Sequence, residues 1–291
     1  MRYAFIDTQR DQAAVRQLCE WLDVAPSGYY AWRKRPPSQR QHDNDRLVER
    51  IRAVHQTSRQ TYGSPRICAE LRDQGEGCNH KRVERLMRLH GIRAKQPRRC
   101  VRTTDANHSQ LVAENVLNQQ FEAEAPNRVW TADITYIDTA EGWLYLAVVM
   151  DLFSRRIVGW AMADHMLTRL VEDALAMALE QRQPTDGLLH HSDRGSQYAS
   201  HDYQDRLTAA GIQVSMSRRA NCYDNAAQES FFGTLKTECV TERYASRAAA
   251  RGSLFEYIEV WYNRQRRHST LGYLSPEQFE NKQAMSSPAI H

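Results

Sequence analysis

The sequence lacks a long apolar run. None of its hydrophobic stretches approaches the ~18 residues that a transmembrane helix requires, so we expect no membrane segment. Residues 1–7 contain no apolar core of the kind found in secretory signals, and we expect none. The chain has 291 residues, of which 41% are hydrophobic and 25% charged, and this composition suits an ordinary globular protein of two domains.

Paired cysteine motifs are also missing. The cysteines are scattered and form no C-x-x-C pair, which argues against a disulfide scaffold or a zinc knuckle and fits a reducing cytoplasm. We expect buried thiols at all six positions, which are Cys19, Cys68, Cys78, Cys100, Cys222 and Cys239.

Acidic residues are scarce in the first third of the chain. Residues 1–104 carry 22 Lys and Arg against 11 Asp and Glu, whereas residues 105–291 carry 17 against 24. The net charge of +4 therefore conceals a basic front of +11 and an acidic back of −7. A basic segment is typical of nucleic-acid binding, and acidic residues can supply metal ligands, although an acidic surface is commonly only solvated.

A pair of short helices is predicted within the basic region. Ser64 is expected to cap a first helix with Pro65 at its first position, and Asn79 to cap a second helix that ends at Gly91. One face of the second helix is apolar, and the other carries Lys81, Arg82, Arg85 and Arg88. The pattern is typical of a DNA-binding helix-turn-helix, and the alternative is a helical hairpin with a solvated charged face.

Shorter elements are expected before this pair. Helical spacing predicts two short helices within residues 11–35 with a break at 25–28, then a linker at 36–41 and a helix at about 44–57.

The sequence changes character near residue 127. Three β-branched and aromatic runs at 128–137, 143–150 and 156–162 are joined by five-residue connections, which are typical of antiparallel hairpins. They precede, in order, a helix, the strand 188–191, a helix near 203–210 and the strand 212–216. This layout predicts an α/β fold with a ribonuclease H-like mixed sheet, and we expect Trp130, Trp143 and Trp160 in its core.

A long amphipathic helix is expected at about 246–262. The predicted regions are then an N-terminal helical DNA-binding or accessory region, a basic helix-turn-helix, a linker, a catalytic core and a C-terminal helical extension. Their bounds are 1–60, 61–104, 105–125, 126–240 and 241–291.

Three carboxylates occupy positions where chemistry is a reasonable expectation. Asp133 interrupts a strand that is otherwise apolar and β-branched, Asp193 follows the strand 188–191, and Glu229 lies on a predicted helix. A buried carboxylate is costly unless it is paired or bound to metal, so together the three favour a magnesium site. Singly, they are explained as a salt-bridge partner, a turn former and a surface acid. His190 and His191 are expected to pack rather than bind metal.

The residues around these carboxylates carry a family resemblance. The blocks are TADITY at 131–136, HSDRGSQY at 191–198 and DNAAQESFF at 224–232, with 35 residues between Asp193 and Glu229 and a basic Lys236 seven residues after Glu229. DLFSRRIVGW at 151–160, YGSPRI at 62–67, HKRV at 80–83 and YNRQRRHSTLGYLSP at 262–276 extend the match. The chain thus resembles the second-frame products of the insertion-sequence-three family, which are bacterial transposases with a retroviral-integrase-like core.

The resemblance implies a chemistry and a set of partners. Asp133, Asp193 and Glu229 would be catalytic and would hold two Mg²⁺ or Mn²⁺ ions, with Asp133 bridging them, for DNA strand cleavage and strand transfer. Lys236 would reach DNA phosphate from the same helical face as Glu229. The partners would be double-stranded DNA, at the terminal inverted repeats of the element and at the target, and further copies of the chain.

The family also implies an upstream-frame (OrfA) partner or fusion, and a bacterial cytoplasmic, nucleoid-associated location. Two alternatives to the transposase remain open. One is a structure-directed nuclease on the same fold that makes no strand transfer, and the other is a non-catalytic DNA-binding regulator.

Overall fold

The computed structural model describes residues 1–96, 113–118, 123–218 and 225–286. The chain divides into two compact units, Met1–Arg52 and Ala53–His291. No helix within the described ranges is both long and apolar enough to cross a membrane. The predicted linker at 105–125 falls largely outside these ranges, as do Cys100 and Cys222.

The first unit is a small helical cluster. It contains α1 (Arg2–Gln9), α2 (Val15–Trp21), α3 (Pro26–Lys34) and the first part of α4 (Gln39–Thr57). Its core is formed by Ile6, Leu18, Cys19 and Tyr29. The helix α1 was not predicted, and the break expected at 25–28 is wrong because Pro26 lies at the start of α3, where its missing N–H costs no hydrogen bond.

The helix pair predicted in the basic region is present at the start of the second unit. Its helices are α5 (Ser64–Asp73) and α6 (His80–Leu89), and the Asn79 side chain caps α6 by accepting from the Arg82 amide. Ser64 is not the cap of α5, since Gly63 takes that position. The Ser64 hydroxyl instead lies 2.9 Å from Nε2 of His80, so it links the two helices.

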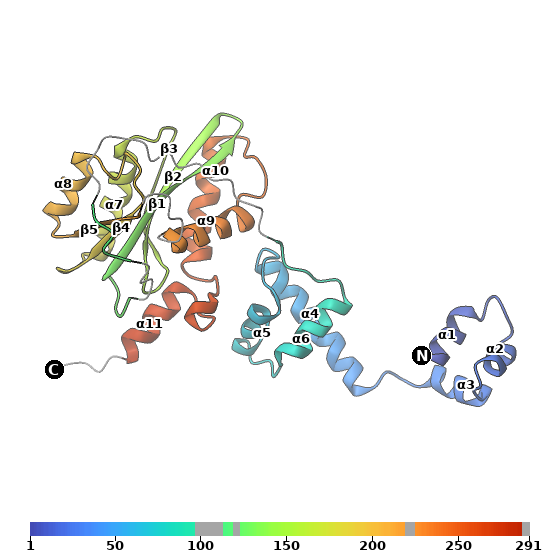
Figure 1. Cartoon of the computed structure of the whole chain (residues 1–291). Helices are drawn as coiled ribbons and strands as arrows, with labels where there is room; N and C mark the ends of the chain where they lie inside the picture. Colours follow the sequence, from blue (N-terminus) through green and yellow to red (C-terminus); the bar gives the residue numbers. More distant parts are fainter. Residues whose placement is uncertain (97–112, 119–122, 219–224, 287–291) are drawn as a thin grey trace. The chain divides into compact units, whose positions relative to one another are not determined.

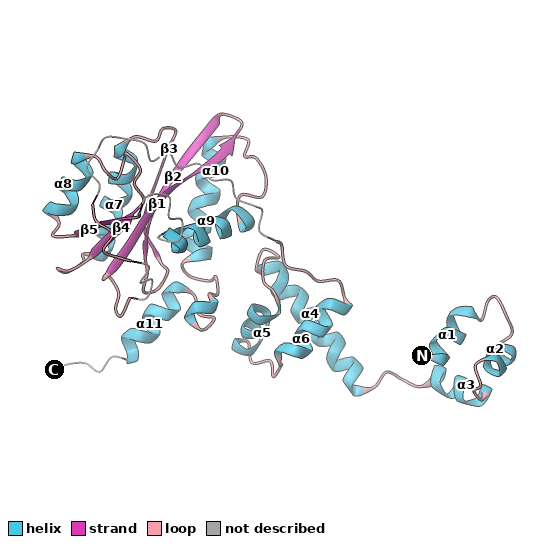
Figure 2. Ribbon diagram, in the orientation of Figure 1, coloured by secondary structure: helices cyan, strands magenta, loops and turns pink. Residues whose placement is uncertain are grey.

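The centre of the second unit is a five-stranded mixed sheet (Figure 2). Its strands are β1 (Val129–Thr139), β2 (Gly142–Asp151), β3 (Ile157–Ala163), β4 (Leu189–Ser192) and β5 (Gln213–Met216), in the order β3-β2-β1-β4-β5. The strands β1, β2 and β3 pair antiparallel, whereas β4 pairs parallel with both β1 and β5. The ribonuclease H-like mixed sheet predicted from the sequence is confirmed.

Helices cover both faces of this sheet (Figure 1). The helices α7 (Thr168–Arg182) and α8 (His201–Ala209) enclose the main core on one face, where Trp130 and Ala132 of β1 point. The close approach of α7 to β3 requires Gly159, because a Cβ there would collide with the Ala174 carbonyl and Ala178. The helix α9 (Ala226–Glu238) packs on β1, and α10 (Arg247–Phe255) contacts β1 and β2.

The tryptophan prediction is right for one position of three. Trp130 is fully buried. Trp143 is 47% exposed, because it lies beside the β1–β2 turn, where its ring packs edge-on against Tyr136. Trp160 is half-buried, and its indole N–H donates to Glu259. The expectation that Trp143 and Trp160 belong to the core is therefore wrong.

The C-terminal segment is part of the second unit. The helix predicted at 246–262 changes type midway, since α10 ends at Phe255 and Glu256–Tyr262 continues as a π-helix. This wider winding directs Tyr257 and Trp261 to the same acceptor, the Glu238 carboxylate. The helix α11 (Pro276–Ser286) is tied to α7 through Glu280, which pairs with Arg182, and Arg182 also pairs with Asp151 at the end of β2.

Candidate active site

The pairing of β1 with β4 places Asp133 and Asp193 beside each other. In the parallel pair β1–β4, the last matched residues are Ala132 and Ser192, so Asp133 is the next residue of β1 and Asp193 is the first residue after β4. Neighbouring strands lie about 4.8 Å apart. Asp133 lies on the face opposite to Trp130 and Ala132, since successive side chains alternate, and this is the face that α9 covers.

Two amides on α9 anchor it to β1 beside Asp133. The Asn225 side chain, at the start of α9, donates from Nδ2 to Oδ2 of Asp133 at 2.9 Å. The buried Gln228 donates to the Thr131 carbonyl at 2.6 Å. Glu229 is the next residue and is exposed to solvent. These contacts hold the Glu229 segment of α9 against the strand that carries Asp133.

The electrostatics link all three carboxylates. The pKa of Asp133 is raised well above its ordinary value, first by burial and then by the negative charge of Asp193, with a further contribution from Glu229. The Ile134 amide, which donates to Oδ1 of Asp133, and the ammonium of Lys236 oppose this rise in pKa. Asp133 is thus a crowded carboxylate whose charged form a cation would stabilise.

Lys236 lies on the same side of α9 as Glu229. Its Nζ sits 4.9 Å from the centre of the Tyr136 ring, a cation–π contact that holds the ammonium near β1. The Asp193 side chain is oriented by the loop that follows β4, because its Oδ1 accepts a hydrogen bond from the Gly195 amide at 2.9 Å.

The donor set suits a hard divalent cation, because all three groups offer carboxylate oxygens. Over the ranges that the structure describes, however, no group of three or more His, Cys, Asp or Glu side chains converges closely enough to hold a single ion.

The two histidines beside Asp193 have structural partners. His190 is fully buried against Tyr203, whose hydroxyl lies 3.0 Å from Nε2, and burial followed by the charge of His191 lowers the His190 pKa to about 3. His191 lies within hydrogen-bond distance of Ser215 and Ser217. Both are packing residues, in agreement with the sequence analysis.

The four cationic residues predicted to bind DNA lie on α6, in the α5–α6 pair. Val83, Leu86 and Met87 fill the buried side of this helix. On its remaining surface Lys81 and Arg88 are exposed, whereas Arg82 and Arg85 are half-buried.

Sequence reasoning assigned no role to Asn225 or Gln228. The sequence signal available for Gln228 was a polar glutamine on an otherwise apolar side of the predicted helix. Asn225 is one helical turn before Glu229, which could have placed it on the same side of α9. Tyr198 was also missed. Its buried hydroxyl has no hydrogen-bond partner among the described residues. Burial raises the pKa of Tyr198, and the negative charges of Asp133 and Asp193 add to that rise.

Comparisons with known proteins agree with this architecture. Models described as "Integrase core domain" match residues 123–222 and 229–283, and one described as "HTH-like domain" matches residues 42–99. These matches define the class, an integrase-core protein with a helix-turn-helix-like domain.

The relatives define the family within that class. The chain is 46% identical to the transposase InsF for insertion sequence IS3A of Escherichia coli (strain K12), over 97% of this chain and 99% of that protein. It is 46% identical to an insertion element IS600 protein of 31 kDa from Shigella sonnei, over 91% of this chain and 98% of the relative. The chain belongs to the IS3 family of InsF transposases, enzymes that cleave and join DNA, and the family resemblance found in the sequence is confirmed.

A solved structure also aligns with the chain, the simian T-cell lymphotropic virus intasome in complex with PP2A regulatory subunit B56 gamma. The identity is 16% and the TM-score 0.48, over 83% of this chain and 76% of that one.

Proposed function

We propose that Asp133, Asp193 and Glu229 are the catalytic residues of this transposase and hold two divalent cations, Mg²⁺ or Mn²⁺, with Asp133 shared between them. The observation that carries the proposal is geometric: Asp193 lies beside Asp133 in the β1–β4 register, and the Asn225 and Gln228 amides hold the Glu229 segment of α9 against β1. Burial raises the pKa of Asp133, and the charges of Asp193 and Glu229 raise it further. Bound divalent cations would stabilise the charge that develops on a scissile phosphodiester and lower the pKa of an attacking water or hydroxyl.

The chain's own residues prepare this site. The Asn225 amide and the Ile134 N–H orient the two oxygens of Asp133, while the Gly195 N–H orients Asp193. Lys236, held over Tyr136, provides a positive charge on the Glu229 side of α9 that can pair with a DNA phosphate. Double-stranded DNA at element ends and target sites is the proposed substrate.

The basic face of α6 is the proposed DNA-binding surface, through Lys81, Arg82, Arg85 and Arg88. The proposed regions are those expected from the sequence, with 61–104 as the helix-turn-helix and 126–240 as the catalytic core. Assembly of several copies on DNA, an upstream-frame (OrfA) partner or fusion, and a location at the bacterial nucleoid complete the proposal. The match of residues 42–99 to an HTH-like domain and of residues 123–222 to an integrase core domain supports the helix-turn-helix and the catalytic core.

A strand-transfer assay with labelled element ends tests the carboxylates. Asp133→Asn, Asp193→Asn and Glu229→Gln should each abolish cleavage and joining while DNA binding and the melting temperature survive. The amide keeps the size of the side chain and removes the negative charge that neutralises the cations. The matched control is Asp173→Asn, an exposed carboxylate on α7, which should leave both reactions unchanged.

The same assay separates the remaining alternatives. A nuclease without strand transfer would yield cut ends and no joined products, and a regulator would yield neither. A variant at Asp133 that still cuts at the wild-type rate, or one that simply unfolds, would return that residue to a structural role.

A further inference from the structure

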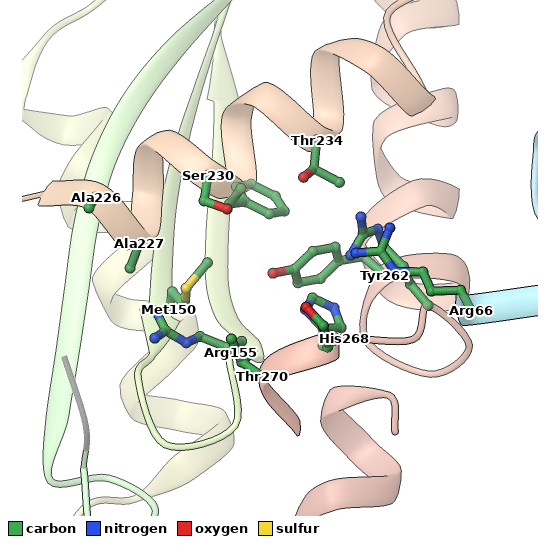
Figure 3. Close-up of a pocket in the computed structure, with 13 residues that line it drawn as sticks. Arg66, Met150, Arg155, Ala226, Ala227, Ser230, Thr234, Tyr262, His268 and Thr270 are labelled. Atoms are coloured by element: carbon green, nitrogen blue, oxygen red, sulfur yellow. The ribbon is translucent and has the colours of Figure 1, made fainter. Parts of the chain in front are cut away.

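A cavity of about 250 Å³ lies between α9 and the C-terminal segment (Figure 3). Ala226, Ser230 and Thr234, spaced one helical turn apart, line it from α9, whereas Glu229 does not. The C-terminal segment closes the other side with His268 and Thr270. Asp133, Asp193 and Glu229 are not among the residues that line it.

Positive charge is concentrated around this cavity. Three arginines line it, namely Arg66 of α5, Arg155 from the β2–β3 turn and Arg266. Arg266 is compensated by the buried Glu238, which it contacts at 2.8–2.9 Å. Glu238 also accepts from Tyr257 and Trp261, so its capacity is largely used.

Arg66 has no comparable acid. Its guanidinium lies 5.7 Å from the centre of the Tyr62 ring, and within the described part of the chain it forms no ion pair. Burial and the charge of Arg266 lower the pKa of Arg66. Both effects disfavour the charged form, and an anion in the cavity would relieve them.

His268 supplies a donor that lacks an acceptor. The residue is only 9% exposed, its ring packs edge-on against Tyr262 at 4.9 Å, and its Nε2 has no hydrogen-bond partner among the described residues. Burial, Arg266, Arg66 and Arg155 push its pKa well below the ordinary value, so the imidazole is neutral. An unpaired buried polar atom is unfavourable, and a bound oxyanion would pair with its N–H tautomer.

We propose that this cavity binds a phosphate group, with Arg66, Arg155 and the Nε2–H of His268 as its principal donors and the hydroxyls of Ser230 and Thr270 as further ones. Arginine guanidinium groups match the geometry of phosphate oxygens, and the volume exceeds that of several waters. The group is either a phosphodiester of bound DNA or free phosphate. The proposal does not depend on the metal-binding role of Asp133, Asp193 and Glu229.

Melting of the full chain in inorganic phosphate, against chloride of equal ionic strength, tests the site. At about five times its Kd, phosphate should raise Tm by about 2–4 °C. His268→Phe keeps the aromatic contact with Tyr262 and removes the donor, so the phosphate-dependent rise should be lost without a lower Tm in chloride. His268→Gln keeps a donor and should retain binding within a few-fold. Arg66→Gln should lose it, and Arg169→Gln, an exposed arginine of α7, should not.

DNA binding distinguishes the two sources of phosphate. If the cavity takes a DNA phosphodiester, His268→Phe and Arg66→Gln should lower the affinity for a duplex at least several-fold, and phosphate should compete with the duplex. If it takes free phosphate, the duplex affinity should stay unchanged while the Tm response is lost. Equal Tm shifts in wild type, His268→Phe and Arg66→Gln would overturn the proposal, as would no response to phosphate together with unchanged DNA affinity.

Discussion

The Asn225 amide donates a 2.9 Å hydrogen bond to the Asp133 carboxylate, and Asn225 begins the helix that carries Glu229. One side chain therefore links the strand and the helix on which two of the proposed catalytic groups lie. The other carboxylate oxygen of Asp133 accepts a hydrogen bond from the Ile134 amide. Asn225 is best described as a positioning residue, because it acts through Asp133.

Removing the hydrogen bond between Asn225 and Asp133 should reduce metal-dependent activity more than it lowers the stability of the fold. We expect Asn225→Ala to lower strand cleavage about 10–100-fold at limiting Mg²⁺, because residues that orient metal ligands have effects of this size. The Mg²⁺ concentration for half-maximal activity should rise, and saturating Mg²⁺ should recover part of the rate. Gln181→Ala, an exposed residue of α7, is the control. An unchanged Mg²⁺ dependence in Asn225→Ala would contradict the role.

The basic surface of α6 predicts how DNA binding depends on the salt concentration. Replacing Lys81, Arg82, Arg85 and Arg88 by alanine should weaken DNA binding and reduce the slope of log K against log salt by as much as about 3–4, since each phosphate contact contributes ~0.9. Fluorescence anisotropy over a series of salt concentrations measures both quantities.

A charge-preserving variant is the control for that experiment. Exchanging lysine for arginine and the reverse at these four positions keeps the charge and should keep the slope. Should the alanine variant show wild-type affinity and slope, the α6 face would be a solvated surface.

The sequence predicted the sheet well because its signals are local. Runs of β-branched and aromatic residues with short connections predicted β1 to β3, and short runs between predicted helices predicted β4 and β5. The three carboxylates were found because each is exceptional in its own segment. Asn225 and Gln228 were missed because their roles depend on partners more than 90 residues away, Asp133 and Thr131.

The errors have similar causes. Trp143 was expected in the core because of its residue type and the apolar run that it begins, but its place beside the β1–β2 turn leaves it exposed. The change from α10 to a π-helix at Glu256 was not predicted, and the Glu238 carboxylate that Tyr257 and Trp261 share lies 19 and 23 residues away in the sequence, so no local pattern encodes that contact.

The buried His190 predicts a loss of stability in acid. Its pKa of about 3 lies below the unfolded value of ~6.5, so the unfolded chain binds the proton first and stability falls as pH drops below ~6.5. Between pH 6.5 and 5 this group should cost about 1.6 kcal/mol in the free energy of unfolding.

Urea titrations at the two pH values measure this loss. His190→Gln, which cannot titrate, should show a smaller loss than wild type, and His201→Gln, an exposed histidine of α8, should behave as wild type. Identical losses in wild type and His190→Gln would contradict the prediction.

The buried pair of Glu238 and Arg266 should be important for stability. Glu238→Gln should lower the free energy of unfolding by about 3–5 kcal/mol, because it leaves a buried guanidinium without its counter-charge. Denaturant unfolding measures the change. The control is Asp173→Asn, which breaks the exposed pair with Arg169 and should cost at most about 1 kcal/mol. A comparably small effect of Glu238→Gln would show that the pair is dispensable.

Crystals of the chain grown with Mn²⁺ and measured for anomalous scattering test the central claim most directly. Two peaks roughly 3.5–4 Å apart are expected, both ligated by Asp133, one by Asp193 and the other by Glu229. Asp133→Asn crystals under the same conditions should lose both peaks. Manganese bound elsewhere, with none in contact with the Asp133 carboxylate, would contradict the assignment of these three residues as the metal-binding catalytic site.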